Sequence, residues 1–332
     1  MNTFLAPGDI TMKKLLAIIA LLNVTCLGFV SNAHALGFTT TQITSNAYYD
    51  TEPDINANGD MTWEGNGTIY YLASGSSTPT ALPSPGTINE HPQINNSRHI
   101  VWQGYDSGAG KTVIYRYNGT TTSLISDNSF NSDSPQINNN GNIVWVTNDG
   151  ADTEIVFYNP STPPAIFVTN NTYADLNPQI NDSDTITWQG IDADGDYEIY
   201  QKTLTGVIEQ VNDINNFDDI DPQINSAGDI VWTAMVDANN GDIHLKKASS
   251  VMAYISSGAS DEQHPKINNS GMVVWIGDHN TSHEDIYFYD PATRIPYQLT
   301  NESSVNTNPS LPNQAISPYS LIIGNLLYRG AS

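Results

Sequence analysis

A short phrase that recurs six times sets the strongest limit on what this chain can fold into. Each copy begins with proline, has isoleucine two residues later and asparagine three residues later, and carries a tryptophan ten residues after the proline. The prolines are Pro53, Pro92, Pro135, Pro178, Pro222 and Pro265. Successive prolines are 39, 43, 43, 44 and 43 residues apart, and these copies contain all six tryptophans of the sequence. Such a period indicates a repeat architecture.

Each unit divides into four short apolar stretches separated by turn-forming residues. In the third copy they are residues 135–138, 143–147, 154–158 and 165–169. Short β-branched and aromatic runs bounded by Asn, Asp and Gly are typical of strands. We find no convincing helical period after residue 35. Four strands in a repeat of about 40 to 45 residues predict an all-β fold, a β-propeller of four-stranded blades.

A turn follows the asparagine of each copy. Four copies have glycine three residues after it, whereas Arg98 and Asp184 take this place in the other two. The spacing suits a hairpin in which glycine is left-handed and asparagine bonds the neighbouring backbone. We therefore expect the turns with Arg98 and Asp184 to differ.

A degenerate seventh copy ends the chain. It starts at Pro309, reads as two strands around Gly324-Asn325, and lacks both the tryptophan and a fourth strand. Residues 41–44 (Thr-Gln-Ile-Thr) match residues 297–300, the fourth strand of the sixth copy. We favour seven blades, with this N-terminal strand closing the last blade and covering its edge. The alternative is six blades and a disordered tail.

Residues 1–35 have the pattern of a secretory signal peptide. Lys13 and Lys14 precede an apolar run over residues 15–30, and residues 33–35 (Ala-His-Ala) supply the small residues of a cleavage site. The run is short of the roughly 18 apolar residues that a membrane-spanning helix needs. We expect residues 36–332 to form a single propeller domain without a transmembrane segment, in the periplasm or secreted. Met12 is an alternative start.

The charge balance restricts the partners. The chain has 11 Lys and Arg against 35 Asp and Glu, for a formal net charge of -24. This acidic surface repels nucleic-acid phosphates, so we expect no nucleic-acid partner. The hydrophobic fraction of 39% is too high for a disordered acidic chain. We expect a monomer whose partner is an extracytoplasmic protein or glycan.

The repeat resembles that of the TolB-like β-propeller family. The pattern Pro-x-Ile-Asn-x-x-Gly-x-Ile-Val-Trp, followed by Glu-Ile-Tyr-x-Tyr and Gln-Leu-Thr, is similar to units that run from a proline-led inner strand to a terminal Leu-Thr. The resemblance covers residues 41 to about 300. Asn-x-x-Gly replaces the Ser-Pro-Asp-Gly turn of that family. The resemblance implies a propeller fold and a place in the cell envelope, and it does not imply membership of the Tol-Pal machinery.

The position before each repeat proline is polar and variable. It holds Glu52, His91, Ser134, Asn177, Asp221 and His264. If the inner strands start at one mouth of the channel, these side chains ring that mouth, where histidine and carboxylate can bind a ligand or act as acid and base. Scattered exposed polar residues are the simpler interpretation. Our candidate binding residues are His91, His264, Asp221 and Glu52.

The hairpin after Trp188 is the most acidic in the chain. Asp192, Asp194, Asp196 and Glu198 alternate along it, and carboxylate oxygens are ligands that Ca²⁺ prefers. Asp-Gly is also ordinary hairpin chemistry on a solvated loop. These four residues are our candidate Ca²⁺ site and the only metal candidate that we name.

Nothing in the repeat singles out one blade as catalytic. Tryptophans at the same place in every unit are typical of packing between sheets rather than of sugar stacking. The sequence contains no nucleophile motif, phosphate-binding glycine loop or cysteine-based metal spacing. We therefore predict a non-enzymatic interaction module. The alternative is a metal-dependent carbohydrate-active enzyme that resembles propeller polysaccharide lyases, with a metal, His and Gln near the channel. The scarcity of basic residues argues against an anionic polysaccharide as substrate.

Overall fold

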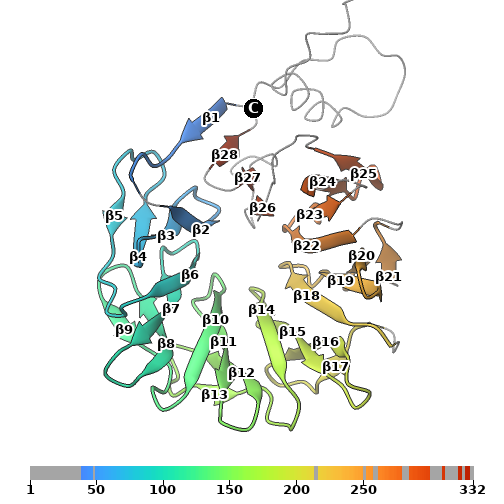
Figure 1. The fold of residues 1–332 in the computed structure, drawn as a ribbon, viewed down its shortest axis with the longest axis horizontal. Coiled ribbons are helices and arrows are strands. Elements are labelled where there is room, and N and C mark those ends of the chain that lie inside the picture. The colour runs from blue at the N-terminus through green and yellow to red at the C-terminus, as the bar shows by residue number, and fades with distance from the viewer. Residues whose placement is uncertain are drawn as a thin grey trace, which may run out of the picture.

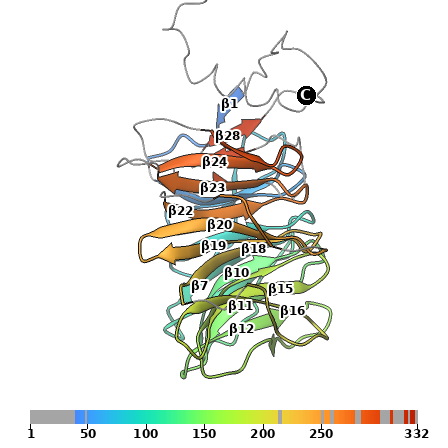
Figure 2. The ribbon, with the colours of Figure 1, turned by 90° about the vertical axis from the view of Figure 1, so that its right-hand side faces the viewer.

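The computed structural model describes residues 43–47, 49–212, 216–249, 252–256, 261–278 and 284–299, and the backbone of residues 39–42, 309–310, 321–323 and 326–329. Every regular element among them is a strand. Four-stranded antiparallel sheets stand around a common axis, seen along that axis in Figure 1 and from the side in Figure 2. The prediction of an all-β, propeller-like chain is confirmed. The expected signal peptide, residues 1–35, lies outside the described residues.

Six sheets share one strand order, in which each strand pairs with the next along the chain. Their innermost strands are β2 (Asp50–Ile55), β6 (Asn89–Ile94), β10 (Asn131–Ile137), β14 (Asp175–Ile180), β18 (Asp219–Ile224) and β22 (Asp261–Ile267). The second strands are β3 (Met61–Gly65), β7 (Ile100–Asp106), β11 (Ile143–Asn148), β15 (Thr185–Ile191), β19 (Ile230–Asp237) and β23 (Val273–Asp278).

Two further strands complete each of these six sheets. The third strands are β4 (Thr68–Leu72), β8 (Lys111–Tyr117), β12 (Thr153–Tyr158), β16 (Tyr197–Thr203), β20 (Asn240–Lys246) and β24 (Glu284–Asp290). The outermost are β5 (Thr80–Ala81), β9 (Thr122–Leu124), β13 (Ile166–Phe167), β17 (Glu209–Gln210), β21 (Met252–Tyr254) and β25 (Ile295–Gln298). In the third sheet, β10 begins at Asn131 instead of the expected Pro135, because the pairing continues across a bulge between Asp133 and Gln136.

Segments from both ends of the chain share another sheet. β1 (Thr39–Gln42) pairs antiparallel with β28 (Leu326–Arg329), which is followed by β27 (Leu321–Ile323) and β26 (Pro309–Ser310). Thr41 lies opposite Leu327 in this pairing. The expected strands on either side of Gly324-Asn325 are therefore present. The N-terminal strand begins two residues before the matching stretch 41–44.

Tryptophans fill the space between neighbouring sheets. Five of the six are at most 1% exposed, and Trp63 is 5% exposed. Trp145, for example, packs in one cluster with Val101 and Ile114 of the preceding sheet. The prediction that the tryptophans are packing residues is confirmed. Their burial between sheets removes the indole faces from contact with a ligand.

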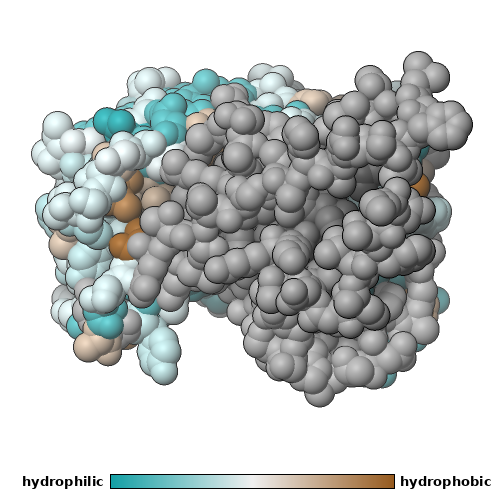
Figure 3. Space-filling view, turned by 90° about the horizontal axis from the view of Figure 1, so that it is seen from above, coloured by the Kyte–Doolittle hydropathy of each residue, from teal (hydrophilic) through white to brown (hydrophobic). Residues whose placement is uncertain are grey.

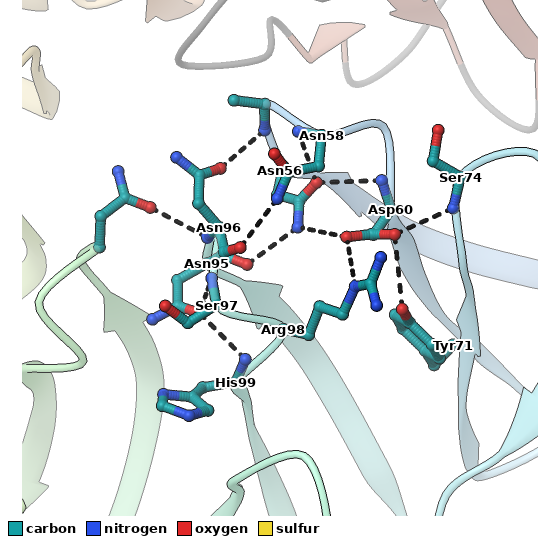
Figure 4. A network of polar contacts seen from close by, with 12 residues as sticks. Asn56, Asn58, Asp60, Tyr71, Ser74, Asn95, Asn96, Ser97, Arg98 and His99 are labelled. Atoms are coloured by element: carbon teal, nitrogen blue, oxygen red, sulfur yellow. Dashed lines mark hydrogen bonds and ion pairs between the residues drawn. The ribbon is translucent and has the colours of Figure 1, made fainter.

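The repeat asparagines join each inner strand to the next. The side-chain Nδ2 atoms of Asn56, Asn95, Asn138, Asn181 and Asn225 donate to the main-chain oxygen of the following repeat asparagine, at 2.9, 3.0, 2.9, 3.1 and 3.2 Å. The Oδ1 of Asn56 also accepts two amides of its own turn, from Asn58 and Asp60, at 3.0 Å each. Figure 4 shows these contacts in the first two sheets. One side chain thus closes a turn and ties two sheets together.

The expectation that the turns with Arg98 and Asp184 differ is wrong. Arg98 has a φ of 63° and Asp184 a φ of 58°, so both are left-handed like the glycines at this position. Their amides donate to the oxygens of Asn95 and Asn181 at 3.0 Å, as Gly59 does to Asn56. Contacts with the neighbouring sheet offset the backbone strain: Arg98 Nε donates to Asp60 at 2.9 Å, and Asp184 accepts from Asn138 at 2.7 Å.

Candidate functional site

The six polar residues before the repeat prolines share one backbone conformation. Glu52, His91, Ser134, Asn177, Asp221 and His264 all have φ between 50° and 54°. Each lies where the pairing of the inner and second strands shifts register. A left-handed φ strains residues other than glycine and persists only where the surrounding structure imposes it. The fold therefore presents a variable polar side chain at the same point of each inner strand.

The four predicted binding residues come together as two pairs. His91 Nδ1 lies 2.9 Å from Glu52 Oε1, and His264 Nδ1 lies 2.8 Å from Asp221 Oδ2. The histidine side chains are 50% and 54% exposed, so a ligand can reach them. The backbone amide of His91 also donates to Glu52 at 2.6 Å. Each pair joins two neighbouring inner strands. We call the six residues before the repeat prolines the mouth residues, after the place that we predict for them.

Amide side chains extend the second of these pairs into a network. Asn177 Nδ2 donates to Asp221 Oδ1 at 3.1 Å. Gln189 Oε1 accepts from Asn177 Nδ2 and from the amide of Asp221, both at 2.9 Å. A corresponding contact links the second and third sheets, where the amide of Ser134 donates to Gln103 at 3.0 Å. Second-strand glutamines thus hold the backbone of Ser134 and Asp221 in place.

Pairing keeps the two histidines protonated to a higher pH than usual. The hydrogen bond to Glu52 raises the pKa of His91 against the opposing effect of burial, and Asp221 does the same for His264. Burial opposes ionisation of Glu52, but its hydrogen bonds from His91 together lower its pKa. Each pair therefore keeps its charge-assisted hydrogen bond to a higher pH than an unpaired histidine would allow.

A cavity of about 90 Å³ lies between the inner strands and is lined from six sheets. The residues that directly follow the repeat prolines contribute to its wall, namely Asp54, Gln93, Gln136, Gln179 and Gln223. Burial raises the pKa of Asp54 to about 6, even though its carboxylate accepts the amide of Ile94 at 2.8 Å. Lys266 has the same place in β22, and burial lowers its pKa.

The glutamines of this wall are not among the predicted site residues. The alternation of side chains within the repeat could have identified them. Because side chains alternate along a strand, the residue between proline and isoleucine faces away from both of them. Proline and isoleucine pack toward the sheet interior, as buried Pro92 and Ile94 do in β6, and Gln93 between them faces the channel.

Three of the four acidic residues proposed for Ca²⁺ converge at one end of the β15–β16 hairpin. One carboxylate oxygen from each of Asp192, Asp196 and Glu198 lies within 4.8 Å of the other two. No other His, Cys, Asp or Glu group of three or more in the described part of the chain is arranged in this way. Asp194 lies outside the group on the exposed turn, where its amide donates to Asp192 at 2.7 Å.

No protein-family model and no curated protein sequence matches this chain. Solved structures match its fold. Oligogalacturonate lyase from Vibrio parahaemolyticus matches with a TM-score of 0.68 over 89% of this chain and 94% of that chain, at 8% identity. TolB from Acinetobacter baumannii matches with a TM-score of 0.52 over 78% of this chain and 64% of that chain, at 15% identity. A puromycin-hydrolyzing peptidase from Mycobacterium tuberculosis matches with a TM-score of 0.61 over 78% of this chain and 45% of that chain, at 11% identity.

These similarities define the fold and leave the function open. The neighbours include a TolB protein, in agreement with the resemblance of the repeat, and also a peptidase and a lyase. The chain spans less than two thirds of the TolB chain and less than half of the peptidase chain. None of the described elements is a helix that could cross a membrane.

Proposed function

We propose that this chain is a non-enzymatic β-propeller binding module of the periplasm or extracellular space, and that a protein or glycan partner binds at the channel mouth. One observation carries this proposal: the six mouth residues share a single backbone conformation while their side chains vary from copy to copy. A fixed backbone that presents different polar groups is suited to specific recognition. The location rests on the signal peptide expected over residues 1–35.

Charge pairing at the mouth also supports a binding role. Each histidine has a carboxylate partner, His91 with Glu52 and His264 with Asp221, and each pair is partly exposed. Such groups can form charge-assisted hydrogen bonds with a polar ligand at little further desolvation cost. The part of the described surface visible in Figure 3 is largely hydrophilic, which suits a polar partner such as a glycan or a hydrophilic protein face.

We infer that residues 36–332 form one seven-bladed ring, closed by the N-terminal strand. The pairing of β1 with β28 supports this closure. Ile43 supports it independently, because it packs in a cluster with Trp63 of the first sheet. The residue after a fourth strand packs in this way elsewhere, as Val211 does with Trp232 of the next sheet.

A carbohydrate-active enzyme is the second candidate. It is favoured by the raised pKa of two partly exposed histidines that each contact a carboxylate, since such a group can act as a general acid. A lyase acting on an acidic glycan would release an unsaturated product, which ultraviolet absorbance detects.

The test compares partner capture by the mature chain and two variants. The mouth variant carries Glu52→Gln, His91→Asn, Asp221→Asn and His264→Asn. The control carries Asp127→Asn and Asp237→Asn, two exposed acids that lie between β9 and β10 and at the end of β19. We expect immobilised wild type and control to enrich the same envelope component or array glycan, and the mouth variant to bind it at least about tenfold more weakly. Equal binding by the mouth variant contradicts the proposal. Release of unsaturated product by wild type but not by the mouth variant favours the enzyme instead.

A further inference from the structure

The acidic group on the β15–β16 hairpin is built from both sides of one turn. Asp192 directly follows β15, while Asp196 directly precedes β16 and Glu198 lies within it. The amide of Asp192 donates to the oxygen of Asp196 at 3.0 Å, which closes the turn. Because alternate residues of a strand share a face, Asp196 and Glu198 point to the same side. The turn thus directs three carboxylates toward one point.

The spacing of these carboxylates fits a single cation. One oxygen from each of the three lies within 4.8 Å of the other two. Two oxygens that each lie about 2.4 Å from a shared Ca²⁺ are separated by at most about 4.8 Å. The three side chains can therefore bind one ion without a change of backbone.

Buried oxygens without hydrogen bonds provide a second, independent sign of a ligand. Glu198 is 0% exposed, and its Oε1 has no hydrogen-bond partner. Both carboxylate oxygens of Asp196 are also buried and without a partner. Proteins pair almost all of their buried polar atoms, and an unpaired buried carboxylate is especially costly. A cation held by the group would supply a partner to such buried oxygens.

Other carboxylates lie close to the group. Asp218, which directly precedes β18, accepts the amide of Tyr197 at 2.9 Å. The charge of Asp218 acts on Asp196, and that of Asp219 acts on Glu198, whereas no lysine or arginine charge of the described residues acts on either. A bound cation would reduce the repulsion between these carboxylates.

We propose that Asp192, Asp196 and Glu198 bind one Ca²⁺ ion, which fastens the two sides of the β15–β16 turn together. An all-oxygen ligand set selects a hard cation, and the absence of His and Cys from the group disfavours zinc and copper. Ca²⁺ accepts irregular coordination completed by water or backbone oxygens, whereas Mg²⁺ demands a near-octahedral site.

The test titrates CaCl₂ into the chelator-treated full chain by calorimetry. We expect one ion per chain with a dissociation constant on the order of 10⁻⁴ M, the range of extracellular modules. Asp196→Asn and Glu198→Gln should each weaken binding by about tenfold or more, since each removes a ligand charge. Asp194→Asn, the matched control in the same turn, should bind like the wild type. Absence of binding by the wild type, equal binding by Asp196→Asn, or equal binding of MgCl₂ overturns the proposal.

Thermal unfolding distinguishes a metal-binding role of Glu198 from a purely structural role. The amide oxygen of Glu198→Gln can still accept from Asn212, which contacts Glu198 in the wild type. Without Ca²⁺ this variant should have a higher Tm than the wild type, because it lacks a buried charge, and CaCl₂ should no longer raise its Tm. A lower Tm together with an unchanged response to CaCl₂ also overturns the assignment.

Discussion

The indole Nε1 of Trp188 donates a 2.7 Å hydrogen bond to the carboxylate of Asp175, the first residue of the inner strand in the same sheet. The same contact joins Trp63 to Asp50 and Trp232 to Asp219. Trp188 is 1% exposed, so its N–H has no access to water. The repeat therefore combines the packing of a large aromatic ring with a polar contact that fixes the ring's orientation.

Removing the acceptor should destabilise the fold. We expect Asp175→Ala to lower the free energy of unfolding by about 1–3 kcal/mol, because it leaves a buried N–H without a partner. Asp175→Asn should cost less, since its amide oxygen can still accept from Trp188 and the exposed Asn171 can turn its own amide toward water. Urea unfolding of the three proteins measures the difference. Equal stability of Asp175→Ala and the wild type would refute the role given to this contact.

Asp175 should also make the stability of the fold depend on pH. Burial raises the pKa of Asp175 to about 6 from an ordinary 3.8, against the effect of its hydrogen bonds. The folded state therefore favours the protonated carboxyl, and its contribution to stability falls as pH rises from about 4 to 6. Asp175→Asn should lose this dependence. A Tm difference between variant and wild type that stays constant from pH 4 to 7 contradicts the prediction.

The histidine pairs at the mouth should be visible by NMR. We expect His91 to titrate above 6.5 in the wild type and closer to 6.5 in Glu52→Gln. Asp221→Asn, as the matched control, should shift His264 and leave His91 unchanged. Because the folded pKa is raised, the pair stabilises the fold below pH 6.5 and loses this effect as pH rises through the folded value. If His91 titrates identically in wild type and Glu52→Gln, the pair does not form in solution.

Replacing the donating amide of a repeat asparagine by a carboxylate should destabilise the fold. Asn138 donates to the oxygen of Asn181 at 2.9 Å and to Asp184 at 2.7 Å. Asn138→Asp would place a carboxylate against both acceptors, at a cost of about 3 kcal/mol or more. Asn140 Nδ2 makes an exposed contact of the same kind, to the oxygen of Asp182 at 2.7 Å, so Asn140→Asp should cost less than about 1 kcal/mol because water solvates the new carboxylate. Guanidinium unfolding compares the two variants, and equal losses would contradict the role given to the buried contact.

The repeat alone predicts the four-stranded units, because proline, asparagine and tryptophan have the same structural role in every copy. Contacts between copies are harder to foresee. His91 and Glu52 are 39 residues apart, and only the arrangement of the sheets brings them together. Arg98 shows the same difficulty, since its left-handed turn is supported by Asp60 of the neighbouring sheet. The alternation of charges along the hairpin also predicts Asp194 as a metal ligand, but this residue lies on the exposed turn, outside the group.

Hydrogen–deuterium exchange of residues 39–44 provides the most direct test of the closed ring. If β1 pairs with β28 in solution, a peptide covering these residues should exchange as slowly as one covering β9, an outermost strand of the second sheet. Deleting residues 36–44 should then speed exchange in residues 326–329, which lose their partner strand. Exchange of residues 39–44 at the rate of an unfolded chain, while β9 stays protected, would contradict the ring.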